Sequence, residues 1–194
     1  MSVADPGSSA AQLVESKVDS EAVFDGKLLH VRRDTVRLPD QTLATREYVV
    51  HPGAVLVVPV LADGRLVVER QYRYPLGRVM IEFPAGKLDP GERPLDSAQR
   101  ELREEAGYRA ASWWRLGCVH PIVSYSTEMI ELFVAEDLTE VGAQLDAGEF
   151  LEIALMSVDE MLTAIDRGEI TDAKTVAALL LYTRRRGTRP GLPR

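Results

Sequence analysis

The sequence predicts an α/β fold in which a mixed β-sheet lies between helices and an antiparallel β layer precedes it. Strand-like runs dominate the middle of the chain, whereas helical patterns occupy residues 94–106 and the C-terminal end. Residues 54–61 (AVLVVPVL) are almost unbroken apolar, as expected of a strand buried on both faces. A length of 194 residues fits one domain with a small accessory layer.

The composition limits the kinds of partner that the chain can bind. Its formal net charge is −7 and its pI is about 5.1, which argues against broad binding to nucleic acid or to anionic membranes. If the substrate is itself an anion, a local positive charge must be supplied, and a metal ion could supply it.

The N-terminus and the cysteine content favour the cytoplasm. The start of the chain has neither a basic segment nor an apolar core, and no apolar run approaches the roughly 18 residues of a membrane helix. Cys118 is the only cysteine, so no internal disulfide can form, and a reducing compartment fits best. We interpret Cys118 as a small buried apolar residue.

The N-terminal quarter of the chain is expected to form the accessory layer. Residues 1–18 are small and polar and read as a flexible segment. Residues 19–50 contain two strand candidates, 27–38 and 45–50, separated by the turn-like sequence PDQ.

The central elements follow a strand–turn–strand pattern. Asp63-Gly64 is a hairpin signal, so residues 65–73 are predicted to pair with the apolar strand 54–61. A further short strand is predicted at 79–83, and it leads into Pro84-Ala85-Gly86.

The C-terminal half reads as three strands and two helices. The strands are expected at 113–120, 129–138 and 150–158, the first two around a polar loop. Ser157 and Glu160 form a capping box that starts a helix. The last helix covers 172–186 and carries basic residues in its final turn, where the helix dipole favours them. Adjacent residues of a strand face opposite ways, so we expect one of Trp113 and Trp114 in the core and the other at an interface.

The helix at 94–106 carries an unusual cluster of glutamates. At 100° per residue its apolar residues form one buried stripe, and the glutamates lie on an adjacent face, roughly 100° away and therefore at the edge of the core. The stripe consists of Leu95, Ala98, Leu102 and Ala106, and the acidic face of Glu101, Glu104 and Glu105. This face is either a solvated surface supported by Arg100 and Arg103, or a set of oxygen ligands for Mg²⁺ or Mn²⁺.

The loop before the helix favours the metal interpretation. Gly86 and Gly91 permit backbone conformations closed to other residues, and they let a ligand approach the backbone closely. Glu92 lies just ahead of the helix. Magnesium bound by a few carboxylates commonly takes phosphate oxygens as its remaining ligands.

This segment resembles the signature of the Nudix hydrolases. The matching pattern is Gly86, five residues, Glu92, seven residues, and then Arg100-Glu101-Leu102-x-Glu104-Glu105-x-Gly107-Tyr108. Only Tyr108 is bulkier than the usual aliphatic residue. The flanks resemble the ADP-ribose pyrophosphatase branch, at Arg46-Glu47, His51 to Val55, Gln71-Tyr72-Arg73, Glu82 to Gly86 and Gly168 to Thr175.

The resemblance implies a Nudix α/β/α sandwich over residues 51–188, with residues 189–194 as a tail. It implies that Glu101 and Glu105 are the main metal ligands, with Glu104 and the Ala85 carbonyl as further ones. Arg100 would hold a neighbouring carboxylate in place, and Glu92 would close the loop onto the helix.

The remaining roles fall outside the signature. The general base resembles a glutamate on a loop before a late strand, which Glu149 fits best and Glu152 second. Arg73, at a strand end, is expected to pair with phosphate. Arg46 and Glu47 resemble a pair that contacts adenine, and Glu128 resembles a residue that binds the terminal ribose.

We therefore expect a Mg²⁺-dependent hydrolase, with Mn²⁺ as a possible substitute, that splits ADP-ribose into AMP and ribose 5-phosphate. The branch usually has a proline where this chain has Val123, which weakens the prediction of ADP-ribose in particular. GDP-mannose, NADH, dinucleoside polyphosphates, damaged nucleotides and a non-catalytic nucleotide sensor stay as alternatives. The resemblance also implies a homodimer through the N-terminal strands. The acidic composition predicts no nucleic-acid or membrane partner.

Overall fold

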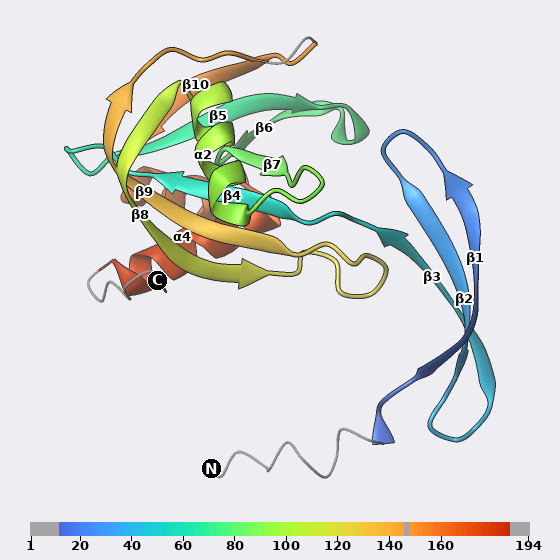
Figure 1. Ribbon diagram of the computed structural model, residues 1–194. Helices are drawn as coiled ribbons and strands as arrows, with labels where there is room; N and C mark the ends of the chain where they lie inside the picture. Colours follow the sequence, from blue (N-terminus) through green and yellow to red (C-terminus); the bar gives the residue numbers. More distant parts are fainter. Residues whose placement is uncertain (1–11, 146–147, 187–194) are drawn as a thin grey trace, which may run out of the picture. The chain divides into compact units, whose positions relative to one another are not determined.

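A computed structural model describes residues 12–145 and 148–186 of the chain (Figure 1). The chain divides into two compact units. The first comprises residues 1–51 and 122–128, and the second comprises residues 52–121 and 129–194. The expected tail at 189–194 and most of the expected flexible N-terminal segment lie outside the described residues.

The first unit is built on an antiparallel three-stranded sheet in the order β1-β2-β3. Its strands are β1 (Ser16–Asp25), β2 (His30–Arg37) and β3 (Leu43–Val50). The loop 122–128 joins this unit because Val49 exchanges backbone hydrogen bonds with Tyr125 and Thr127, at 2.9 and 3.0 Å. The sequence patterns do not predict the first strand, which includes residues 16–18 of the segment expected to be flexible.

The second unit contains two sheets instead of one. The strand order is β10-β5-β6 in a three-stranded antiparallel sheet and β7-β4-β9-β8 in a four-stranded sheet. In the latter, β4 and β9 run parallel, so the sheet is mixed as predicted. The strands are β4 (Ala54–Pro59), β5 (Leu66–Arg73), β6 (Arg78–Glu82), β7 (Ala85–Lys87), β8 (Tyr108–Val119), β9 (Ile130–Glu140) and β10 (Leu151–Met156).

The predicted hairpin around Asp63-Gly64 is only partly correct. The turn is present, since Leu61 N donates to Arg65 O at 2.9 Å, and Gly64 has φ +84°. The strands on either side meet at the single bridge between Val60 and Leu66. They then separate, because β7 and β9 already occupy both edges of β4, and β5 pairs instead with β6 and β10.

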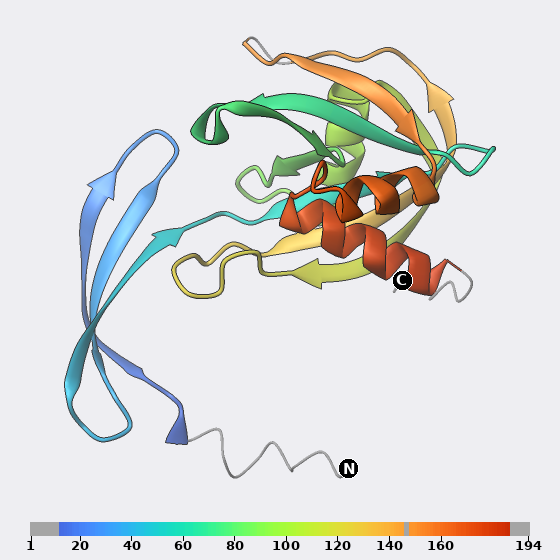
Figure 2. The same ribbon diagram turned by 180° about the vertical axis from the view of Figure 1, so that it is seen from behind.

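Helices cover both faces of the four-stranded sheet, which gives the α/β/α layering (Figures 1 and 2). On one face, Val55 and Val57 pack with Ala98 and Leu102 of α2 (Pro94–Glu104). On the other, Leu56 and Val58 share a core with α3 (Val158–Asp166) and α4 (Ala173–Arg185). Every residue of β4 is buried, as predicted from its unbroken apolar sequence.

The predicted start of α3 is confirmed, and the structure shows a side-chain cap at the start of α4 as well. Ser157 and Glu160 form the predicted capping box at α3, and Asp172 caps α4 by accepting a hydrogen bond from Thr175 N. The turn between β5 and β6 contains the short 3₁₀ helix η2 (Tyr74–Leu76). No helix in the described parts of the chain is long and apolar enough to cross a membrane.

Two predictions about single side chains on β8 have different outcomes. Trp114 is buried in the core and Trp113 is half-buried, as the alternation of a strand requires. The prediction that Cys118 is buried is wrong, because its side chain is exposed. Position 118 lies near the end of β8, two residues beyond the buried Leu116 and past an irregularity in the pairing with β9, so the residue does not reach the core.

Candidate active site

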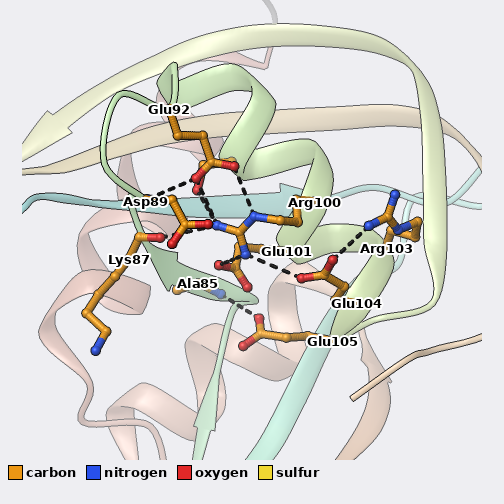
Figure 3. A network of polar contacts seen from close by, with 10 residues as sticks. Ala85, Lys87, Asp89, Glu92, Arg100, Glu101, Arg103, Glu104 and Glu105 are labelled. Carbon is orange, nitrogen blue, oxygen red and sulfur yellow. Dashed lines mark hydrogen bonds and ion pairs between the residues drawn. The ribbon is translucent and has the colours of Figure 1, made fainter. Parts of the chain in front are cut away.

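The helix α2 presents its glutamates toward a short loop and the strand β7. Pro94 stands in its first turn, and Ala98 and Leu102 anchor its buried stripe with no exposed surface. Glu101 and Glu105 are only 8% and 5% exposed. They are therefore more buried than the helical geometry alone predicts, because the loop 84–93 folds over them (Figure 3).

Arg100 holds three glutamates of the cluster together (Figure 3). Its Nε and Nη2 donate to the two oxygens of Glu92, each at 2.9 Å. Its Nη1 donates to Glu101 at 2.7 Å and to Glu104 at 3.3 Å. The guanidinium group thereby offsets the repulsion among carboxylates that the sequence concentrates in one turn.

These contacts separate the proton affinities of neighbouring glutamates. The hydrogen bonds from Arg100 lower the pKa of Glu92 to about 2. Burial raises the pKa of Glu101 in spite of the same guanidinium, whose charge and hydrogen bond act in the opposite direction. Glu92 is therefore a stable anion of the loop. Arg100 does not fully offset the cost of burying a charge on Glu101.

Glu105 lies at the inner end of the cluster. The backbone N–H of Ala85 donates to its Oε2 at 3.0 Å. Burial raises the pKa of Glu105, and the charges of Glu69 and Glu101 raise it further. Two raised glutamate pKa values on one helix indicate carboxylates that a bound cation would stabilise in their charged form.

Gly86 is required where the loop meets the helix. A Cβ atom at this position would lie 1.8 Å from Oε1 of Glu101 and 2.0 Å from its carboxylate carbon. Any side chain would therefore displace Glu101. Gly107, just past the helix, has φ +74°, and a Cβ atom there would lie 2.7 Å from Ala143 N. Both glycines of the signature thus have a steric reason in this fold.

Arg73 does not point an unpaired guanidinium into the site. Its Nε and Nη2 donate to the two oxygens of the buried Glu82, at 2.7 and 2.8 Å. Lys174, from the start of α4, also binds Glu82 and reaches Asp172 at 2.9 Å. Arg73, Glu82 and Lys174 line a cavity of about 490 Å³. The phosphate contact predicted for Arg73 stays a prediction.

The two candidates for the general base are placed differently. Glu149 is half-buried, its Oε1 accepts a hydrogen bond from Gln71 at 3.4 Å, and its charge raises the pKa of Glu101 and Glu105. The side chain of Glu152 is 75% exposed and pairs with Arg70 at 3.2 Å. Glu149 therefore lies within reach of the charge of the acidic cluster, whereas Glu152 faces solvent.

The other predicted substrate residues belong to the first unit. Arg46 pairs with Glu15 at 2.9 Å, and Glu47 pairs with Arg33 at 2.9 Å. Arg46 and Glu47 line a pocket of about 330 Å³, together with Val123, which is 85% exposed. Oε1 of Glu128 lies 3.9 Å from Nε2 of His51.

The sequence patterns do not identify one buried glutamate. Glu69, on β5, has no exposed surface, and its charge acts on Glu105. The signal in the sequence is an acidic residue directly after the apolar run Leu66–Val68. The prediction that this strand pairs with residues 54–61 is the reason that the burial of Glu69 is not expected, since the strand instead pairs with β6 and β10 on both sides.

The ligand chemistry of the acidic cluster suits a divalent cation, although the side chains do not converge on one point. In the described ranges, no three His, Cys, Asp or Glu side chains are positioned to share an ion. The donor set consists of hard carboxylate oxygens, and the buried oxygens of Glu69 have no hydrogen-bond partner among the described residues. Arg100 donates hydrogen bonds to one oxygen of Glu101 and one oxygen of Glu104.

An acidic helix, a glycine loop and an α/β/α sandwich occur together in the second unit, and this combination suits a hydrolase of phosphate compounds. The profile of the NUDIX domain matches residues 50–179, and the chain belongs to this family. Residues 15–49 match the N-terminal domain of nucleoside diphosphate sugar hydrolases. Nudix hydrolases generally need a divalent metal.

Several characterised relatives cover most of the chain. An ADP-ribose pyrophosphatase of Bacillus subtilis is 36% identical over 86% of this chain and 91% of its own length. One of Mycobacterium tuberculosis is 36% identical over 84% of this chain and 80% of its own length. A crystal structure of an ADP compounds hydrolase superposes with a TM-score of 0.80 and 25% identity, covering 89% of this chain and 95% of that one.

Proposed function

We propose that the protein is a Mg²⁺-dependent ADP-ribose pyrophosphatase that hydrolyses ADP-ribose to AMP and ribose 5-phosphate. The observation that carries the proposal is the pair of buried glutamates on α2, Glu101 and Glu105, whose pKa values are both raised. Such carboxylates gain most from a hard divalent cation. The assignment of ADP-ribose as the substrate rests on the relatives from B. subtilis and M. tuberculosis, which are both named ADP-ribose pyrophosphatase.

Four groups would hold the metal: Glu101, Glu104 and Glu105 through their carboxylates, and Ala85 through its carbonyl. When bound, the metal neutralises the diphosphate and makes phosphorus more electrophilic. Arg100 is a positioning residue in this proposal, since it fixes Glu101 and Glu104 from one side. Manganese, with the same preference for oxygen ligands, is expected to replace magnesium.

Glu149 is proposed to take the proton from the attacking water. A carboxylate on a loop next to β10 can approach the acidic cluster when substrate binds, and its hydrogen bond to Gln71 is long enough, at 3.4 Å, to be exchanged. We assign Arg73 to the diphosphate, Arg46 and Glu47 to adenine, and Glu128 to the terminal ribose. In each case a charged or hydrogen-bonding group matches the polarity of the substrate part.

We further propose a cytoplasmic homodimer that uses the β1–β3 sheet. The support is the set of exposed apolar side chains on these strands, which a partner subunit would cover: Val18, Val23, Phe24, Leu43 and Val50. Because the chain is acidic, neither nucleic acid nor membrane is proposed as a partner.

A substrate panel tests this function. The purified protein is incubated with Mg²⁺ and with ADP-ribose, GDP-mannose, NADH or diadenosine polyphosphates, and the released monophosphate is measured. We expect ADP-ribose to have the highest kcat/KM and Glu105→Gln to be inactive. A clear preference for GDP-mannose would overturn the assignment of ADP-ribose as the substrate. No turnover of any compound would overturn the proposal that the protein is an enzyme. An active Glu105→Gln variant would reject the metal site.

A further inference from the structure

Glu69 is the most unusual charged residue of the second unit. It lies on β5 with 0% exposure, and neither carboxylate oxygen has a hydrogen-bond partner in the part of the chain that the structure describes. Burying a charged group without partners is strongly unfavourable, and an apolar residue of similar size would be tolerated here. Its neighbours Val67 and Val68 are both fully buried.

The alternation of β5 places Glu69 on the side of α2. Leu66 and Val68 pack into the core shared with α3 and α4, whereas Val67 packs against α2. Glu69 follows Val67 on the same face. Its side chain therefore projects toward α2, the helix whose end carries Glu105.

The positive groups near Glu69 are already engaged. Its direct cross-strand partner is Glu82, which accepts two hydrogen bonds from Arg73 and also binds Lys174. The charges that act on Glu69 are those of Glu82, Arg73, Lys174 and Glu149. Glu105 lies at the C-terminal end of α2, the helix toward which Glu69 projects, and the charge of Glu69 raises the pKa of Glu105. In the described ranges, no arginine or lysine forms an ion pair with Glu69 or Glu105, whereas Arg73 and Lys174 both pair with Glu82.

We propose that Glu69 and Glu105 hold a divalent cation between them, so that Glu69 is a metal-binding residue outside the Nudix signature. This inference rests on the proposed function for the presence of the metal. Mg²⁺ and Mn²⁺ prefer carboxylate oxygens as ligands, and both oxygens of Glu69 have no hydrogen-bond partner among the described residues. A cation would remove both the mutual repulsion and the cost of burial. Arg100 holds the other carboxylates of the cluster, Glu92, Glu101 and Glu104, and does not reach this pair.

Manganese binding tests the role of Glu69 independently of activity. Free Mn²⁺ is titrated into the full-length protein and followed by electron paramagnetic resonance, for the wild type, Glu69→Gln and Glu140→Gln. Glu140 is an exposed carboxylate at the end of β9 and serves as the control for a lost charge. We expect Glu69→Gln to lose about tenfold or more in Mn²⁺ affinity, or one bound ion. The control should bind as the wild type does.

Thermal unfolding in EDTA separates metal binding from a structural role. Glu69→Met replaces the carboxylate by an apolar side chain of similar length, so we expect a Tm at least equal to that of the wild type without metal. Addition of Mg²⁺ should raise its Tm less than it raises that of the wild type. The Met variant also keeps the test decisive if Glu69→Gln does not fold.

Two results would overturn different statements. If Glu69→Gln and Glu69→Met bind Mn²⁺ with the affinity and stoichiometry of the wild type, Glu69 does not bind metal and is a protonated core residue. If the wild type itself binds no Mn²⁺, the proposed metal-dependent function fails instead.

Discussion

Arg100 and Glu92 form a two-pronged ion pair, in which Nε and Nη2 of the arginine each lie 2.9 Å from a different oxygen of the glutamate. The pair connects the loop before α2 to the middle of the helix. Because Nη1 of the same guanidinium reaches Glu101, the position of the loop and that of a proposed metal ligand are linked through one side chain.

The first prediction concerns the pH dependence of this pair. The folded state lowers the pKa of Glu92 to about 2, from an ordinary value near 4.5. The stability that it contributes is therefore present above pH 4.5 and is lost as the pH falls toward 2. We expect Glu92→Gln to lose about 1–2 kcal/mol in the free energy of unfolding at pH 7.

Urea unfolding at several pH values checks this expectation. The difference between the wild type and Glu92→Gln should shrink between pH 4.5 and pH 2, while Glu169→Gln, an exposed control, should match the wild type throughout. An equally large difference at pH 2 and pH 7 would contradict the assignment of a charged Glu92.

The second prediction concerns the close approach of Gly86 to Glu101. A methyl group at position 86 would lie 1.8 Å from Oε1 of Glu101, so Gly86→Ala must move the carboxylate or the loop. We expect a loss of about 10²-fold in kcat/KM, because displacement of a catalytic group by about 1 Å costs that much.

The matched control is Gly64→Ala. Gly64 has φ +84°, and a methyl group added to it would meet no atom within 4 Å, so its replacement strains the backbone in a distant turn without steric conflict. Steady-state kinetics with ADP-ribose should show nearly unchanged activity for Gly64→Ala, although its Tm falls. Comparable kinetics for both variants would show that activity does not depend on the close approach of Gly86 to Glu101.

The site on α2 could be predicted from sequence because its pattern is local. Helical spacing alone places Glu101, Glu104 and Glu105 on one face, and the spacing of Gly86 identifies the loop. The burial of Glu101 and Glu105 could not be predicted in the same way, since it depends on how the loop folds back over the helix.

The partners of β5 could not be predicted because strand pairing is decided at long range. Asp63-Gly64 correctly marks a turn, but both edges of β4 are taken by other segments, β7 and β9. The pairing of β5 with β6 and β10 is what brings Glu69 next to Glu82 and buries it. An error in one local pairing thus hides a residue of the candidate site.

The third prediction concerns the pH dependence of the metal-free protein. Folding raises the pKa of Glu105 through burial and through the charge of Glu69. The stability associated with its protonated form is fully present below pH 4.5 and is lost as the pH rises through the folded-state value. In EDTA, we therefore expect the Tm of the wild type to fall relative to that of Glu105→Gln as the pH increases from about 5 to about 9.

Calorimetry with and without Mg²⁺ provides the measurement. Magnesium should restore the Tm of the wild type at high pH, because it binds the ionised carboxylate, and should affect Glu105→Gln much less. If the Tm of both proteins changed with pH in the same way in EDTA, ionisation of Glu105 would not destabilise the metal-free protein.

The fourth prediction tests how α2 is anchored. Leu102 has no exposed surface and packs in the core with Val55, Val57 and Ala98. Leu102→Ala is expected to lower the free energy of unfolding by about 2–5 kcal/mol. Leu162→Ala on α3, where the side chain is 42% exposed, should cost less than about 1 kcal/mol. The free energies of unfolding are measured by chemical denaturation. Equal values for the two variants would contradict the role of Leu102 in anchoring α2.

The last prediction distinguishes the two candidates for the general base. Glu149 is half-buried and acts electrostatically on Glu101 and Glu105, whereas Glu152 is mostly exposed and paired with Arg70. A base must reach the attacking water beside the acidic cluster, so of the two candidates only Glu149 has suitable surroundings. We expect Glu149→Gln to lower kcat about 10²–10⁴-fold with little change in KM, and Glu152→Gln to remain close to the wild type. The reverse order of kcat values would assign the base to Glu152 instead of Glu149.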